Sequence, residues 1–320
     1  MIDLPARNDG DSTRRNNADD AASQPLLRVR SLSKHFISVS GGLFRRKRID
    51  ILKAVDRVSF DIFRGEAFGI VGESGSGKTT AARCILRALR PTSGSVLFHN
   101  RGRTVDLTAI PERQLKPLRT EMQMIFQDPF SSLNPRMTVG DIVGEPLLIH
   151  GVGNRRERVD RVVEMLERVG LQADHMYRYP HAFSGGQRQR IGIARALILK
   201  PAFVVADEAV SALDVSVQAR VLQLLKQLQR ELNLTYIFVS HDLGVVREFC
   251  DRVAVMYKGR LMEMGPTEQL FNNPRHAYTR VLLSAIPYPD PDRKLEPLRV
   301  QDLKPEELEP LPELATQEAD

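Results

Sequence analysis

The sequence predicts an α/β layer fold. Three short runs, at 67–72, 202–207 and 235–240, consist mostly of apolar residues, as expected for strands buried on both faces of a parallel sheet. Each run lies next to a stretch in which apolar residues recur with the 3.6-residue period of a helix. Buried strands that alternate with amphipathic helices pack as helices against a sheet, which is the α/β architecture.

The elements follow one another along the chain in that pattern. Segments 26–36 and 51–63 show partial alternation of apolar and polar residues and are expected to be strands. The first apolar run then enters a glycine-rich turn, after which a helix is expected from Lys78 to about Arg90. Apolar residues at helical spacing predict amphipathic helices over 159–169 and 217–232.

Composition narrows the class of protein. The chain has 320 residues, of which 42% are hydrophobic, so it can bury a substantial core. No apolar run approaches the roughly eighteen residues of a membrane span, and the first residues lack the apolar core of a secretory signal. We therefore expect a soluble cytoplasmic protein. Two cysteines, Cys84 and Cys250, are too few for a disulfide framework or a four-cysteine metal site.

Charge is unevenly distributed. Residues 1–25 hold five acids and three bases with little to bury, which predicts a disordered tail. Residues 287–320 hold ten acids, four bases and seven of the nineteen prolines, which predicts an extended tail on the surface. The segment between them is basic, but it contains no zinc-finger spacing, RNP motif or basic heptad array, so no nucleic-acid partner is expected. The basic cluster Arg45–Arg48 is either a solvated loop or a contact with anionic lipid headgroups.

The first strong motif is Gly-Glu-Ser-Gly-Ser-Gly-Lys-Thr at 72–79, which matches G-x-x-x-x-G-K-[ST]. Its glycines allow successive N–H groups to face an anion, and the following helix adds the positive end of its dipole. Lys78 would contact the β- and γ-phosphates of a nucleotide, Thr79 would ligate Mg²⁺, and Thr80 would donate near the α-phosphate. The residues expected to contact the nucleotide are Gly72, Ser74, Gly75, Ser76, Gly77, Lys78, Thr79 and Thr80.

An acid pair ends the apolar run 202–207. Asp207 and Glu208 stand where the strand reaches its C-terminal end, which is the edge at which open α/β sheets bind ligands. Adjacent residues of a strand point to opposite faces, so the two acids must differ in role. Asp207 is expected in the Mg²⁺ shell, and Glu208 is expected to polarise the attacking water.

Four further elements complete a family pattern. Gln127 ends the strand 122–126, Ser-Gly-Gly-Gln occupies 184–187, Ser-Ala-Leu-Asp occupies 211–214, and His241 follows the third apolar run. In this order they resemble the ATPase subunit of ABC transporters over about residues 26–265. The resemblance implies a P-loop ABC ATPase fold with an antiparallel β subdomain and a helical subdomain at about 129–195. A C-terminal extension would span 266–320.

The resemblance also implies a dimer. Residues Ser184, Gly185, Gly186 and Gln187 open a helix and repeat the anion-binding design of the phosphate loop. A second such site on the same ATP is redundant within one subunit, whereas it makes sense if it faces the ATP of a neighbour. In the family, two ATPase subunits stack head to tail around two ATP molecules. The partner here would be a sister or an identical subunit.

Other roles follow from position in the family pattern. Glu208 would be the general base, His241 would bridge the γ-phosphate and the attacking water, and Gln127 would reach the Mg²⁺ and the water. Asp214 would link the two sites of the dimer. Phe36 stands where the family places an aromatic residue that stacks on adenine, and the alternative is a core residue on an edge strand.

Three stretches, 127–147, 206–222 and 273–291, resemble the branch of importers that carries oligopeptides and dipeptides. The resemblance implies two transmembrane permease subunits as partners, an indirect role for a solute-binding protein, and a peripheral location on the cytoplasmic face of the membrane. Another small solute, such as a nickel complex or glutathione, is an alternative cargo. A soluble ABC ATPase without a permease and a small-molecule kinase are alternatives from other classes.

Overall fold

The computed structural model describes residues 24–40, 48–128, 131–285 and 298–316. The predicted tail 1–25 lies outside these residues except at its last two positions, and so does the cluster Arg45–Arg48 except for the backbone of Arg48.

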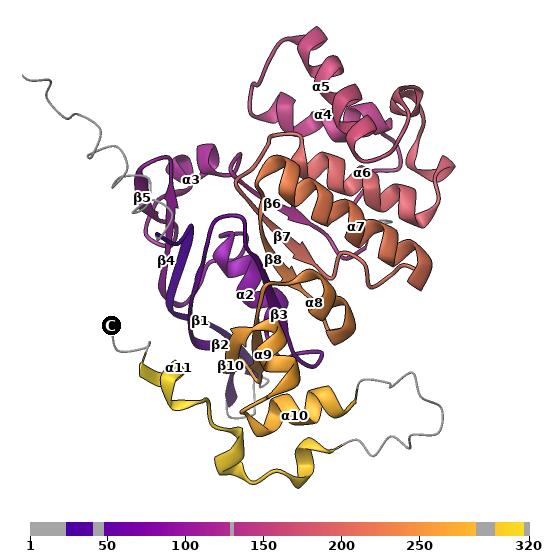
Figure 1. Ribbon diagram of the computed structural model, residues 1–320. Helices are drawn as coiled ribbons and strands as arrows, with labels where there is room; N and C mark the ends of the chain where they lie inside the picture. The colour runs from indigo at the N-terminus through magenta and orange to yellow at the C-terminus, as the bar shows by residue number, and fades with distance from the viewer. Residues whose placement is uncertain (1–23, 41–47, 129–130, 286–297, 317–320) are drawn as a thin grey trace, which may run out of the picture.

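A six-stranded sheet forms the centre of the molecule, in the order β10-β9-β3-β8-β7-β6 (Figure 1). The strands β6, β7, β8, β3 and β9 are neighbours in that order, and each pair is parallel. Strand β10 pairs antiparallel with β9. The three predicted apolar strands are confirmed as β3, β7 and β8, which lie side by side and are buried along their whole length. The strands are β3 (Ala67–Val71), β6 (Met122–Ile125), β7 (Phe203–Asp207), β8 (Thr235–Val239), β9 (Arg252–Tyr257) and β10 (Arg260–Pro266).

A second, antiparallel sheet has the order β2-β1-β4-β5. The segments predicted as the first two strands are confirmed, and they form the long antiparallel pair of β1 and β2. The strands are β1 (Leu27–Ser40), β2 (Arg48–Ile62), β4 (Ser93–Asn100) and β5 (Arg103–Asp106).

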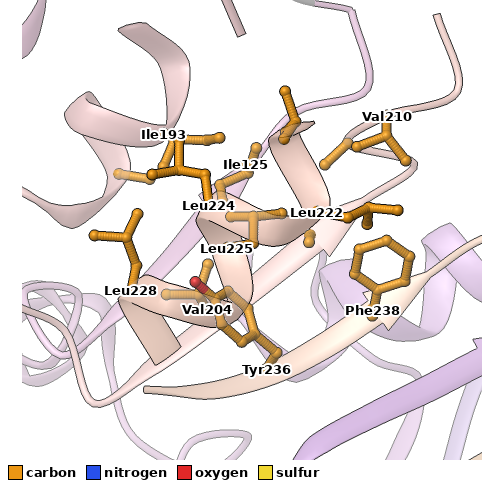
Figure 2. Close-up of a cluster of buried hydrophobic side chains, with 14 of the residues drawn as sticks. Ile125, Ile193, Val204, Val210, Leu222, Leu224, Leu225, Leu228, Tyr236 and Phe238 are labelled. Atoms are coloured by element: carbon orange, nitrogen blue, oxygen red, sulfur yellow. The ribbon is translucent and has the colours of Figure 1, made fainter. Parts of the chain in front are cut away.

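The two faces of the central sheet belong to two hydrophobic cores, because successive residues of a strand point to opposite faces. On β3, Phe68 and Ile70 join the core shared with the antiparallel sheet and helix α2 (Lys78–Ile85), whereas Ala67 and Val71 join a second core on the opposite face. Figure 2 shows this second core, where leucines of α7 (Val215–Leu232) pack onto side chains of β7 and β8.

Helix α2 is shorter than the sequence pattern suggests. It ends at Ile85 rather than near Arg90. Arg87 takes a left-handed backbone conformation with φ of 55°, and its guanidinium donates to the carbonyl oxygens of Leu107 and Ile110. Pro91 follows Arg90 and disfavours a helical conformation there.

The segment 131–197 is mostly helical. It contains α4 (Val139–Ile149), α5 (Arg155–Arg168), η1 (Ala173–Tyr177), η2 (Pro180–Ala182) and α6 (Gly185–Leu197). Helices α4 and α5 stand away from the central sheet, while α6 and α7 lie next to it (Figure 1). Helix α3 (Glu112–Leu118) connects β5 to β6.

After β10 the chain lies at the end of the molecule opposite to α4 and α5 (Figure 1). The remaining elements are α8 (Leu243–Phe249), α9 (Thr267–Asn272), α10 (Ala277–Ser284), η3 (Val300–Asp302), η4 (Pro305–Leu308) and α11 (Pro312–Thr316). The expectation of an extended tail is therefore wrong for residues 298–316. Pro305 and Pro312 each occupy the first position of a short helix, where a missing N–H costs nothing.

Candidate functional site

The candidate site lies at the C-terminal edge of the parallel strands. The loop after β3 holds the 72–79 motif, Glu208 follows β7, and His241 stands two residues after β8. Gln127 lies two residues after β6. Since these strands are parallel, their C-terminal ends meet at one edge, which brings together side chains more than a hundred residues apart.

The backbone of the 72–77 loop requires glycine. Gly72, Gly75 and Gly77 have φ values of 148°, 79° and 102°. A Cβ atom at Gly72 would meet the Met256 carbonyl oxygen at 2.1 Å, and one at Gly77 would meet the Ala54 carbonyl oxygen at the same distance. The loop therefore lies tightly against neighbouring backbone. Thr80, in the first turn of α2, is half-buried beside it.

Lys78 is buried at the base of this loop. Its Nζ atom donates to the carbonyl oxygens of Gly72 and Glu73, each at 2.8 Å. Burial lowers the pKa of Lys78, and the nearby carboxylates of Glu208 and Asp207 offset part of that effect. Backbone oxygens of the loop thus hold the positive charge of the ammonium group in place.

Thr79 and Asp207 form a direct pair. The Thr79 hydroxyl donates to Asp207 Oδ1 at 2.7 Å, and Arg83 lies 3.7 Å from the other carboxylate oxygen. Burial raises the pKa of Asp207, while the hydrogen bond from Thr79 and the charge of Arg83 lower it. Two oxygen donors of the kind that Mg²⁺ prefers therefore lie next to each other beside the phosphate loop.

Glu208 stands between Gln127 and His241. Gln127 Nε2 donates to Glu208 Oε2 at 2.8 Å, and His241 Nδ1 lies 3.2 Å from Glu208 Oε1. Glu208 itself has φ of 49°, and its N–H donates to the Val239 carbonyl oxygen. The carboxylate therefore contacts two polar side chains from the loops after β6 and β8, and the left-handed backbone at Glu208 ends the extended conformation of β7.

The Ser184–Gln187 motif opens helix α6. The Ser184 hydroxyl accepts from the N–H of Gln187 at 3.4 Å, and the Gln187 side chain accepts from the N–H of Ser184 at 3.0 Å, which is a capping box. Ser184 is exposed, while Gly185 and Gly186 are half-buried. Within the ranges that the structure describes, no hydrogen bond joins this motif to the 72–79 loop of its own chain.

Asp214 and Phe36 are the two remaining residues of the predicted site. Asp214 caps α7, where its carboxylate accepts from the N–H of Val217 and the hydroxyl of Ser216, and these hydrogen bonds lower its pKa. Phe36 lies on β1 with 42% of its surface exposed, so it is not a core residue. The Lys34 ammonium stands 5.1 Å from the centre of its ring.

Two residues at the site escaped the sequence analysis. Arg83 follows Thr79 by one helical turn, so the period of α2 could have indicated its position near Asp207. Tyr278 comes from α10, and its hydroxyl accepts a hydrogen bond from the N–H of Glu73 in the phosphate loop at 3.3 Å. The sequence contains no signal for that contact, because the two residues are 205 positions apart.

Together, the phosphate-loop motif with its lysine and the paired acids at one sheet edge define a P-loop ATPase. Comparison with known proteins specifies the family. The model of the ABC transporter family matches residues 55–211, and that of the oligopeptide/dipeptide transporter C-terminal region matches 262–310. The chain therefore belongs to the ABC transporter family, as one of its ATP-binding subunits.

Individual relatives agree with this assignment. A putative peptide import ATP-binding protein of Brucella ovis is 54% identical over 272 residues, which is 85% of this chain and 82% of the relative. The oligopeptide transport ATP-binding protein OppF of Bacillus subtilis is 52% identical over 84% of this chain and 85% of its own. Among solved structures, the dimeric post-hydrolysis state of the ATP-binding cassette MJ0796 bound to ADP and Pi has a TM-score of 0.64 and 29% identity, covering 75% of this chain and 98% of that one.

Among the described residues, the structure contains no helix with the length and apolar character needed to cross a bilayer.

Proposed function

We propose that the chain is the ATP-hydrolysing subunit of an importer for oligopeptides or dipeptides. The observation that carries the proposal is the placement of Glu208 between Gln127 and His241 at the same sheet edge as the phosphate loop. The cargo class is supported by the match of residues 262–310 to the oligopeptide/dipeptide transporter C-terminal region and by the names of the two relatives. The chain would divide into the ATPase domain at 26–265 and the extension at 266–320.

The proposed mechanism uses each group where the structure places it. The 72–79 loop binds the phosphates, with Lys78 moving from its backbone partners to the β- and γ-phosphates. Thr79, Asp207 and Gln127 would hold Mg²⁺, which when bound would neutralise charge on the phosphates. Glu208 accepts a proton from the attacking water, and His241 orients that water against the γ-phosphate.

The Ser184–Gln187 motif is proposed to act on a neighbouring subunit. Its first residue, Ser184, is exposed, and the motif makes no hydrogen bond to its own phosphate loop within the described ranges. A helix N-terminus with exposed N–H groups binds phosphate well. Two subunits arranged head to tail would each close this motif over the other's ATP, with Asp214 near the junction and Phe36 stacked on adenine. The partner is a sister or an identical subunit.

A groove near Gln127 suits the permease subunits. It has a volume of about 720 Å³ and is lined by residues that include Arg119, Phe126 and Ile149. Phe126 is 44% exposed and Ile149 58% exposed, so an apolar surface is open to a partner. Because Phe126 directly precedes Gln127, a partner in this groove could move the side chain that touches Glu208. The chain would then work on the cytoplasmic face of the membrane.

The test is Glu208→Gln in the assembled complex. Replacing the carboxylate by an amide removes the proton acceptor and keeps the shape, so we expect ATP to bind normally while hydrolysis falls by about 10²–10⁴-fold. Glu248→Gln, on an exposed position of α8, is the matched control and should hydrolyse at the wild-type rate. Hydrolysis by the Glu208 variant at the wild-type rate would contradict the proposed role.

The cargo requires a second measurement. The complex with its solute-binding protein should show ATP hydrolysis that is stimulated by dipeptides or oligopeptides. Stimulation by glutathione or a nickel complex alone would assign the subunit to another solute. A chain that hydrolyses ATP but co-purifies with no membrane protein would favour the soluble class of ABC ATPase.

A further inference from the structure

A side chain of the C-terminal extension hydrogen-bonds to the phosphate loop. Tyr278 of α10 is fully buried, and its hydroxyl oxygen accepts a hydrogen bond from the N–H of Glu73 at 3.3 Å. Burial raises the pKa of Tyr278, so the phenol stays protonated at neutral pH.

The peptide group that Tyr278 holds also organises the loop. This group joins Gly72 to Glu73, and its carbonyl oxygen, which belongs to Gly72, accepts from Lys78 Nζ at 2.8 Å. The carbonyl oxygen of Glu73, on the next peptide group, accepts from Lys78 Nζ at 2.8 Å and from the N–H of Ser76 at 3.1 Å. Both polar groups of the Glu73 main chain are therefore engaged, the oxygen by the loop itself and the N–H by the extension. Movement of this peptide would shift the backbone against which the Lys78 ammonium rests.

Tyr278 is itself fixed from several sides. The centre of its ring lies 4.5 Å from the centre of the Tyr257 ring at the end of β9. His276 Nδ1 accepts from the N–H of Tyr278 at 3.0 Å, so the Nε2 atom of His276 carries the hydrogen and donates to the Glu309 carbonyl oxygen at 2.9 Å. The buried carboxylate of Glu263 on β10 accepts from the N–H groups of Arg275 and His276.

Acidic residues of the tail pair with basic residues of β10 and of the segment before α10. Glu309 pairs with Arg260 at 2.8 Å, and Glu313 pairs with Arg275. The N–H of Leu311 donates to the Met262 carbonyl oxygen, which ties the tail to β10. The described part of the extension is thus anchored along β10, and its Tyr278 side chain reaches the phosphate loop.

We propose that Tyr278 is a positioning residue for the phosphate loop, through which the C-terminal extension sets the affinity for the nucleotide phosphates. The inference rests on the proposed function, because it takes the 72–79 loop as the ATP site. Tyr278 touches the loop from the side of the extension and has no role in the chemical step.

The test is Tyr278→Phe in the full chain and in the assembled complex. The variant removes a single oxygen, so a loop N–H loses its protein partner and we expect ATP to bind about threefold to tenfold more weakly. In the complex, KM for ATP should rise by the same factor while kcat changes by less than about twofold, because the interaction orders the binding loop in both ground and transition states. Tyr257→Phe removes a hydroxyl from the same ring pair and should leave both constants unchanged.

Hydrogen exchange separates positioning from general destabilisation. In Tyr278→Phe, amides of the peptide that covers 72–78 should exchange faster, whereas those of β7 should exchange as in wild type. Unchanged ATP affinity and unchanged loop exchange would overturn the inference, and so would faster exchange throughout the chain.

The two proposals fail differently. A wild-type chain that binds ATP no better than Lys78→Ala would contradict the proposed function. A wild-type chain that binds ATP, together with a Tyr278→Phe chain that binds it equally well, would overturn only the inference about the extension.

Discussion

Gly186→Ala should destabilise the chain by a specific clash at the start of α6. A Cβ atom there would meet Val217 Cγ1 at 2.4 Å, which is far below van der Waals contact. Val217 cannot easily rotate away, because a β-branched side chain in a helix has one strongly preferred rotamer. Its backbone is also held, since the N–H of Val217 donates to the capping carboxylate of Asp214. The first turn of α6 or of α7 must therefore move.

The same helix offers a matched control. Gly192 lies farther along α6, and a Cβ atom added there would meet nothing within 4 Å. Gly192→Ala should therefore stabilise the chain by about 0.5–1 kcal/mol, which is the usual gain in a helix interior. Overpacking at Gly186 costs about 1–3 kcal/mol. The replacement of glycine by alanine stabilises the first turn of a helix less than the helix interior. We expect the two variants to differ by roughly 1.5–4 kcal/mol in the free energy of unfolding.

Urea denaturation followed by circular dichroism measures this difference, provided that the m-value is unchanged. A functional readout accompanies it. Gly186→Ala should retain ATP binding by the isolated chain, because the 72–79 loop is intact, but the assembled complex should hydrolyse ATP more slowly because the Ser184–Gln187 motif is displaced. If Gly186→Ala proved as stable as Gly192→Ala, the packing of α6 against α7 described above would be wrong.

Two further predictions concern ionisable groups. Burial raises the pKa of Cys84 to about 11 and that of Cys250 even further, so neither thiol should be alkylated by iodoacetamide in the native chain at pH 8. After denaturation, mass spectrometry should find both thiols modified. Labelling of either thiol in the native chain would contradict its burial. Burial also raises the pKa of Asp207, so the folded state binds its proton more tightly than the unfolded state and the ionised carboxylate costs stability at neutral pH. Asp207→Asn should therefore raise the free energy of unfolding of the nucleotide-free chain at pH 7, and the gain should shrink as the pH falls through the folded-state pKa toward 3.8. Asp214→Asn is a control with the opposite sign, because hydrogen bonds lower the pKa of Asp214 and its ionised form stabilises the fold at neutral pH. Its free energy of unfolding at pH 7 should therefore fall. The same change in the free energy of unfolding for both variants would refute this reasoning.

Local patterns predicted the central strands because each is short, apolar and followed by a turn. The same kind of reasoning placed the helix after the phosphate loop but extended it too far. The helix ends at Ile85, and the left-handed Arg87 that follows donates to Leu107 and Ile110, two contacts that no local pattern reveals. The local signal of Pro91 disfavours a helical conformation only at Arg90. The helical turns of the tail were missed for a different reason, since Pro305 and Pro312 begin short helices instead of preventing them.

The amino-acid sequence alone specifies the set of chemical groups and the strand ends that carry them. The glycines of the phosphate loop, Lys78 and the Asp207–Glu208 pair are readable because each lies in a continuous stretch, where spacing alone sets the geometry. Which distant groups meet is visible only in the folded chain. The contact of Gln127 and His241 with Glu208 depends on the order of parallel strands, and that of Tyr278 with Glu73 depends on where the extension packs. Such contacts form between segments that are far apart in the chain, so they follow from the packing of whole elements rather than from local backbone preferences.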